Sequence, residues 1–187
     1  MCCRYGASAK MYEKLGKYPG MPKKPRTGDI HPSESAVILS AAGEQIRGEE
    51  MRWGFPLDGK LLINARAESA LRKPTFAESM LLRRCVIPAS FFYEWDHEKN
   101  KVTFSLSGDR VLFMAGCYRP EADGNRFVIL TTAANASMEP VHDRMPLIFS
   151  EKNMETYLRD DRAMPDLLAM PSPKLLTHRD YEQLSLF

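Results

Sequence analysis

The pattern of hydrophobic and polar positions predicts short strands separated by turns, with few helices. Residues 102–106 alternate strictly, which places Val102, Phe104 and Leu106 on one face of a half-buried strand. Further strand candidates are short apolar runs: 36–39, 51–55, 61–65 and 85–95. Pro88 lies inside the last of these runs and favours a bulge or a sheet edge there.

The strand candidates around 101–107, 111–119 and 126–134 follow one another with short turns between them. Such spacing is typical of an antiparallel meander. Residues 16–35 hold four prolines and three glycines, which predicts an irregular surface loop.

Two segments carry helix signals. In residues 75–84, Thr75 is a candidate N-cap with Glu78 three positions later, which is the capping-box pattern. A second helix is expected at 151–159, capped by Ser150. We therefore expect an α+β fold dominated by an antiparallel sheet curled towards a barrel, with a few short helices and a single domain over 1–187.

Composition narrows the class of protein. The chain has 187 residues, of which 44% are hydrophobic and 27% charged, as in an ordinary soluble domain. It contains neither a membrane-length apolar run nor a signal-peptide pattern, which predicts a cytoplasmic monomer with no membrane contact. The net charge of +2 is too small to indicate nucleic-acid binding by itself, so a DNA-binding surface would be a local basic patch.

The cysteines differ in their surroundings. Cys85 and Cys117 lie in apolar runs and are expected to be buried and inert. The chain has no CxxC pair and no HExxH, GxxxxGK[ST] or GxGxxG motif, so neither a metal nor a cofactor is expected.

Cys2 is a candidate nucleophile once the initiator methionine is removed. Its α-amine and thiol would then lie on adjacent carbons, a pair that condenses with an aldehyde to a Schiff base and then to a five-membered thiazolidine. An α-amine with a pKa of about 7.7–8.0 is partly unprotonated at neutral pH, whereas a thiol with a pKa of about 8.5 is largely protonated. The amine is therefore expected to attack first and the sulfur second.

Six short motifs occur together in a fixed order: MCCRYG, WGFP, INARAES, SFFYEW, TTAAN and PVHDRMP. In this combination the chain resembles the SRAP family, the SOS-response-associated peptidases or abasic-site processing proteins, over nearly its whole length. The resemblance implies covalent capture of abasic sites in single-stranded DNA during the DNA-damage response, with lyase-type chemistry and nucleoid association when bound to DNA.

The resemblance also implies roles for residues of this chain. Cys2 is the expected nucleophile, and Asn64 orients the N-terminus and the sugar. Glu94 and His142 are expected to exchange protons with the reacting groups. Four further residues are expected to contact DNA: Arg4, Trp53, Arg66 and Arg144.

One position departs from the family pattern, because Cys3 stands where glycine is usual after the catalytic cysteine. Its side chain puts the rate of capture in question rather than the function.

Two alternative functions stay open. One is a thiol peptidase in which Cys2 attacks a peptide bond with His142 as base, although no local signature such as CGSCW is present. The other is a single-stranded DNA-binding module without catalysis.

Overall fold

A closed barrel forms the centre of the molecule in the computed structural model, which describes residues 2–179. Its strands are β3 (Ser35–Ala42), β4 (Gln45–Trp53), β8 (Arg84–Ala89), β11 (Leu112–Glu121) and β12 (Gly124–Ala133). The strands are hydrogen-bonded in the order β12-β4-β3-β8-β11, and β11 pairs again with β12. The ring closes through the parallel pair of β12 with β4, which joins Arg126 to Arg52 and Phe127 to Trp53.

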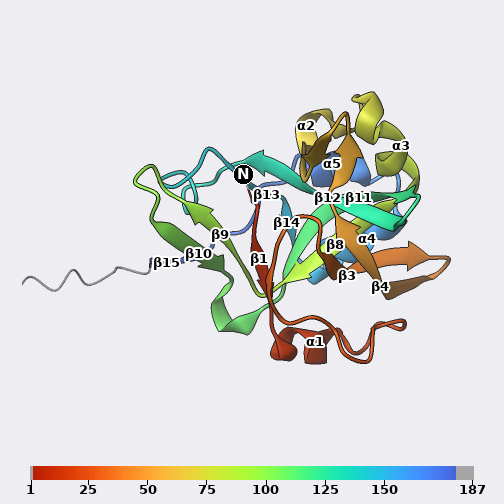
Figure 1. The fold of residues 1–187 in the computed structure, drawn as a ribbon, viewed down its shortest axis with the longest axis horizontal. Helices are drawn as coiled ribbons and strands as arrows, with labels where there is room; N and C mark the ends of the chain where they lie inside the picture. The colour runs from red at the N-terminus through yellow and green to blue at the C-terminus, as the bar shows by residue number, and fades with distance from the viewer. Residues whose placement is uncertain (1, 180–187) are drawn as a thin grey trace, which may run out of the picture.

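A second sheet lies beside the barrel (Figure 1). Its order is β15 (Leu176–Arg179), β10 (Lys101–Ser105), β9 (Phe91–Trp95), β1 (Tyr5–Ala7) and β2 (Gly28–Ile30). All four pairings are antiparallel. This sheet brings the first residues of the chain against β9.

Short strands extend the barrel and link it to the start of the chain. β7 (Asn64–Arg66) pairs in parallel with β12, and β13 (Arg144–Pro146) pairs antiparallel with β12. β14 (Ile148–Phe149) pairs with β11. β5 (Phe55–Leu57) and β6 (Lys60–Leu62) form a separate hairpin.

Short helices lie outside the strands: α1 (Ala9–Leu15), α2 (Ala67–Ala70), α3 (Pro74–Leu82), α4 (Glu151–Arg159), α5 (Met164–Leu168) and the 3-10 turn η1 (Ser107–Asp109). The predicted cap of α4 is confirmed, because the Ser150 hydroxyl accepts from the Asn153 backbone N–H. Met154, Tyr157 and Leu158 form the buried stripe of this helix. No helix in the described part of the chain is long and apolar enough to span a membrane.

The expected α+β class with a sheet curled into a barrel is confirmed. The alternation in β10 is also confirmed, since Val102 and Phe104 are fully buried and the Phe104 ring stacks on Phe92 at a centroid distance of 5.2 Å. Cys85 and Cys117 are fully buried as expected. Burial raises the pKa of Cys117 to about 12 and that of Cys85 well above its usual range, so both remain thiols.

The capping box expected for the helix at 75–84 is wrong. α3 begins with Pro74, and its N-cap is Lys73, which makes no side-chain cap hydrogen bond. Proline is well suited to the first helical position because it lacks the N–H that would otherwise need a partner. Glu78 pairs instead with Arg83 near the end of the helix.

Three other expectations are corrected by long-range pairing. The run 85–95 is two strands in different sheets, β8 and β9, which separate at Ser90. The predicted three-stranded meander is correct for β11 and β12, which form a hairpin. It is wrong for β10, which pairs with β9 and β15. The loop 16–35 contains β2, which pairs with β1. Local periodicity shows that a strand has a buried face, but it does not specify the neighbouring strand.

Candidate active site

Cys2 lies three residues before the start of β1, and only 1% of its surface is exposed. Its thiol donates to the Arg4 carbonyl at 3.8 Å. Burial, followed by the negative charge of Glu94, raises the pKa of the Cys2 thiol far above its usual range. In this environment the sulfur is a thiol rather than a thiolate, so a base must take its proton before it can attack.

Asn64 holds the start of the chain from the barrel side. Its side-chain amide donates to the Cys2 carbonyl at 2.9 Å, across 62 positions of sequence. Asn64 opens β7 and lies opposite Ile129 of β12. Within the described residues its side-chain oxygen is buried and accepts no hydrogen bond. A buried acceptor beside the reactive residue is suited to receiving a hydrogen bond from an amine or a substrate hydroxyl.

Glu94 approaches the same point from the second sheet. Tyr5 pairs with Phe92, and the Tyr93 backbone N–H donates to the Arg4 carbonyl at 3.0 Å, so Glu94 lies level with the two cysteines. It is 4% exposed, whereas a glutamate between two aromatic residues on a strand would ordinarily face solvent. Its charge contributes to the raised pKa of both Cys2 and Cys3.

Gly6 permits the close pairing of β1 with β9. The two strands pair at Gly6 and Phe91, and the Phe91 ring occupies the space that a Cβ on Gly6 would need. Any side chain at Gly6 would displace the Phe91 ring. The glycine of the MCCRYG motif is thus explained by this contact, which keeps Cys2 and Glu94 near one another.

Arg4 anchors β1 to its two neighbours. Its guanidinium pairs with Asp29 of β2 and lies 4.9 Å from the centroid of the Tyr93 ring on β9. The Tyr93 hydroxyl donates to the same carboxylate at 3.0 Å. Burial alone would raise the pKa of Asp29, but the hydrogen bonds from Arg4 and Tyr93 outweigh it, and that pKa is lowered.

His142 stands just before β13, and its backbone N–H donates to the Met138 carbonyl. The ring nitrogen Nδ1 lies 2.9 Å from the Arg144 backbone N–H and 2.8 Å from an Asp143 carboxylate oxygen. The side chain is 28% exposed, so it is accessible to a bound molecule. The contacts described above unite Cys2, Asn64 and Glu94, whereas His142 is supported by a separate loop.

Of the expected DNA-binding arginines, Arg66 alone is unpaired in the described part of the chain. It is exposed at the end of β7 and the start of α2. Arg144 is only 14% exposed and forms a two-point ion pair with Glu68 at 2.7 and 2.9 Å. It also donates to the Thr131 carbonyl at 2.6 Å, so Arg144 connects β13, α2 and β12.

Trp53 was expected to stack on DNA bases, but it is a core residue and its role is in packing. The side chain is fully buried, with its ring stacked on Phe127 and tilted against Tyr5. Its indole N–H donates to the Ile63 carbonyl at 2.9 Å, one residue before Asn64. Neither face of the ring is open to a base, and the side chain instead fixes the backbone that carries Asn64.

The replacement Trp53→Phe is expected to lower the free energy of unfolding by about 1–3 kcal/mol. It removes one of the two hydrogen bonds to the Ile63 carbonyl, which keeps the one from the Ile129 backbone N–H, and it removes part of a core ring. Urea denaturation of the wild type and the variant measures the change. Unchanged stability combined with weakened DNA binding would contradict the packing role.

The sequence pattern did not single out three polar residues that support the site: Asp29, Glu68 and Asn135. Asp29 lies in the segment that was expected to be a loop, and no motif around it in the sequence indicates a role in the site. Glu68 is two positions after Arg66 in the INARAES motif, but its pairing with Arg144 spans 76 residues. Asn135 ends TTAAN; it accepts from the Ser137 backbone N–H and donates to the Ser172 carbonyl, and so supports the loop before His142.

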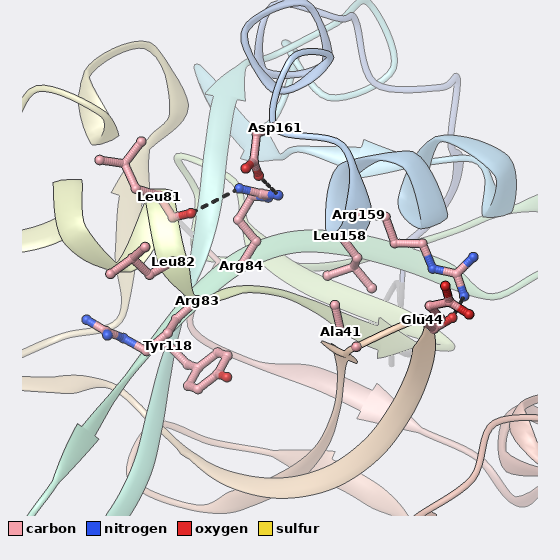
Figure 2. A pocket seen from close by; sticks show the side chains of 11 residues that line it. Ala41, Glu44, Leu81, Leu82, Arg83, Arg84, Tyr118, Leu158, Arg159 and Asp161 are labelled. Carbon is pink, nitrogen blue, oxygen red and sulfur yellow. Dashed lines mark hydrogen bonds and ion pairs between the residues drawn. The ribbon is translucent and has the colours of Figure 1, made fainter.

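A cavity of about 690 Å³ lies elsewhere, between the ends of α3 and α4 (Figure 2). Arg83, Arg84 and Tyr118 line it, with Leu81 and Leu82 at α3. Arg84 is already satisfied by Asp161 and by backbone carbonyls (Figure 2). None of the site residues described above lines this cavity.

The fold and the site define a class of protein: an α+β barrel whose N-terminal segment places a buried cysteine beside a carboxylate. A family model described as SOS response associated peptidase (SRAP) matches residues 1–184, and the chain belongs to this family.

Similar proteins include curated relatives and solved structures. The chain is 33% identical over 156 residues to the abasic site processing protein YoqW of Bacillus subtilis, covering 75% of this chain and 70% of that protein. It is 27% identical over 161 residues to YedK of Escherichia coli, which carries the same description, covering 80% and 67%. A solved structure from Bordetella bronchiseptica matches with a TM-score of 0.79 at 20% identity, covering 95% of this chain and 99% of that one. At that identity the likeness shows the fold alone.

Proposed function

We propose that this protein processes abasic sites in single-stranded DNA by forming a covalent crosslink through Cys2, after removal of Met1. It acts as a monomer, without metal or cofactor, in the cytoplasm and at the nucleoid when bound to DNA. The curated relatives described as abasic site processing proteins support the substrate. The observation that carries the proposal is the placement of Cys2 against both Asn64 and the buried Glu94.

The reaction joins two nucleophiles of one residue to one carbon of the sugar. The closed abasic sugar opens to expose its C1′ aldehyde. The Cys2 α-amine adds to that carbon, and loss of water leaves an imine. The sulfur then adds to the imine carbon, its proton passes to the nitrogen, and a thiazolidine ring results. No oxidant or reductant is needed, because carbon, nitrogen and sulfur keep their oxidation states.

The roles proposed for Asn64 and Glu94 follow from their placement beside Cys2. Asn64 holds the Cys2 carbonyl, and its unused side-chain oxygen receives a hydrogen bond from the α-amine or a sugar hydroxyl. As a general acid/base, Glu94 gives a proton to the departing water, regains one from the nitrogen as the imine forms, and later carries the thiol proton to that nitrogen. His142, in the loop before β13, exchanges the protons of ring opening, as the family resemblance implies.

Mass spectrometry of the intact protein tests the proposal. After mixing with an oligonucleotide that contains one abasic site, the expected mass is protein without Met1 plus oligonucleotide minus one water. The adduct should survive denaturation. Protein of unchanged mass, with DNA bound only under native conditions, would support a binding module instead.

The exposed Arg66 is expected to contact a phosphate. Arg66→Ala should weaken binding to single-stranded DNA several-fold and reduce the slope of log affinity against log salt by about 0.7, the value for one phosphate contact on a single strand. Fluorescence anisotropy at several salt concentrations measures both. Arg162→Ala, at an exposed arginine between α4 and α5, is the matched control. Equal slopes for wild type and Arg66→Ala would place the phosphate contacts elsewhere.

A further inference from the structure

We infer that Asp29 is a positioning residue that holds the Arg4 guanidinium ready for a phosphate beside the abasic site, while it cancels the charge that would otherwise attract undamaged DNA. This inference rests on the proposed function, covalent capture of abasic DNA through Cys2. Asp29 lies outside all six motifs of the sequence.

The Arg4 guanidinium is held on one edge and one face. Its Nε donates to an Asp29 carboxylate oxygen at 2.8 Å, and its Nη2 donates to the same oxygen. The other carboxylate oxygen accepts from the Tyr93 hydroxyl at 3.0 Å, and the Tyr93 ring centroid lies 4.9 Å from the Arg4 Cζ. A side chain restrained in this way loses little further conformational entropy when it binds a ligand.

The opposite edge of the guanidinium is open to a ligand. Arginine has five N–H donors in a fixed plane, so the contacts with Asp29 leave both N–H groups of Nη1 and one of Nη2. Among residues 2–179 these groups have no acceptor, and the Arg4 side chain is 30% exposed. Such an edge matches two oxygens of a phosphate, which makes Arg4 a phosphate contact.

Arg4 is close to the reacting residue. It follows Cys2 by two positions, so their Cα atoms lie no more than about 7 Å apart. The Cys2 thiol also donates to the Arg4 carbonyl. A phosphate bound by Arg4 therefore belongs to the nucleotides that adjoin the captured sugar, and its position determines where the C1′ carbon lies relative to the Cys2 α-amine.

The charge of Asp29 has a second effect. The pair of Arg4 and Asp29 has no net charge, whereas an unpaired arginine would attract any phosphate of an undamaged strand. The carboxylate also repels the phosphate that Arg4 binds. Asp29 thus lowers the affinity for DNA in general and raises the precision with which Arg4 is placed.

Asp29→Asn separates the two effects, because they have opposite signs. Asparagine keeps the size of the side chain and removes its charge. Binding to an undamaged single strand should become about threefold tighter, and the slope of log affinity against log salt should steepen by up to about 0.7. Capture at saturating abasic DNA should slow about 10-fold, since Arg4 is no longer held in place. Fluorescence anisotropy and single-turnover capture measure the two effects.

Glu34→Gln is the matched control, because Glu34 is a carboxylate shortly after β2 that pairs with Arg26 at 2.7 Å. It removes the same charge without contacting Arg4, so capture should proceed at the wild-type rate. Asp29→Glu keeps the charge and should keep the wild-type affinity for undamaged DNA. In an Arg4→Ala background, Asp29→Asn should cause no further slowing of capture, because Asp29 acts through that guanidinium.

Unchanged or weaker binding of Asp29→Asn to undamaged DNA would overturn the inference. Weaker binding with slower capture and a lower free energy of unfolding in urea would show that Asp29 only supports the fold. Equal slowing of capture with and without Arg4 would also overturn it. If the wild type binds abasic DNA but forms no adduct, the proposed function fails, while the affinities and salt slopes still decide the role of Asp29.

Discussion

Replacing Cys2 with alanine is expected to abolish the heat-stable adduct with abasic DNA. The variant keeps an α-amine, so it still forms an imine, but it has no sulfur to close the ring. The imine hydrolyses when the protein is denatured, and a denaturing gel should therefore show no crosslink, a loss of at least about 10³-fold in stable product. Addition of borohydride during the reaction should recover a band by reducing the imine.

Cys3→Gly is the matched control, since it removes the neighbouring thiol and restores the residue usual in the family. The nitrogen of Cys3 is an amide, so this residue cannot form a thiazolidine, and the variant should retain capture. A heat-stable adduct from Cys2→Ala without reductant, or loss of the adduct in Cys3→Gly, would show that the sulfur of Cys2 is not the trap.

Glu94→Gln is expected to slow capture by about 10²–10⁴-fold, the usual cost of losing a general acid/base. Glutamine keeps the volume of the side chain in its buried place between the two sheets. It also removes the negative charge that contributes to the raised pKa of the Cys2 thiol, so that pKa should fall. Binding to an undamaged single strand should change little. Single-turnover capture and anisotropy measure the two effects separately.

Glu98→Gln is the control for this replacement, because Glu98 is an exposed glutamate in the turn that follows β9. It should capture abasic DNA at the wild-type rate. If Glu94→Gln also captured at that rate between pH 6 and 8, Glu94 would have no part in proton transfer. Faster capture would indicate that the charge of Glu94 mainly opposes the thiolate.

The contacts of Asp29 and Tyr93 show why the residues that support the site could not be predicted from the sequence. The sequence motifs were enough to select Cys2, Asn64 and Glu94, which the structure places together. The support around them depends on ion pairs and hydrogen bonds between residues far apart in the chain, such as the 25 positions between Arg4 and Asp29 and the 64 between Tyr93 and Asp29. Such pairs leave no local pattern, because charged residues on a strand are ordinarily solvated.

The sequence by itself determined the chemistry that Cys2 offers, the buried face of β10, the helix α4 with its Ser150 cap, and the α+β class, because each depends on residue type and short-range pattern. The tertiary structure alone decided which strands became neighbours. It separated β8 from β9, closed the barrel through the parallel pair of β4 and β12, and buried Glu94 beside Cys2. The physical reason is that a strand's hydrogen bonds and its buried face are satisfied by any well-matched neighbour, so the choice depends on packing of the whole chain.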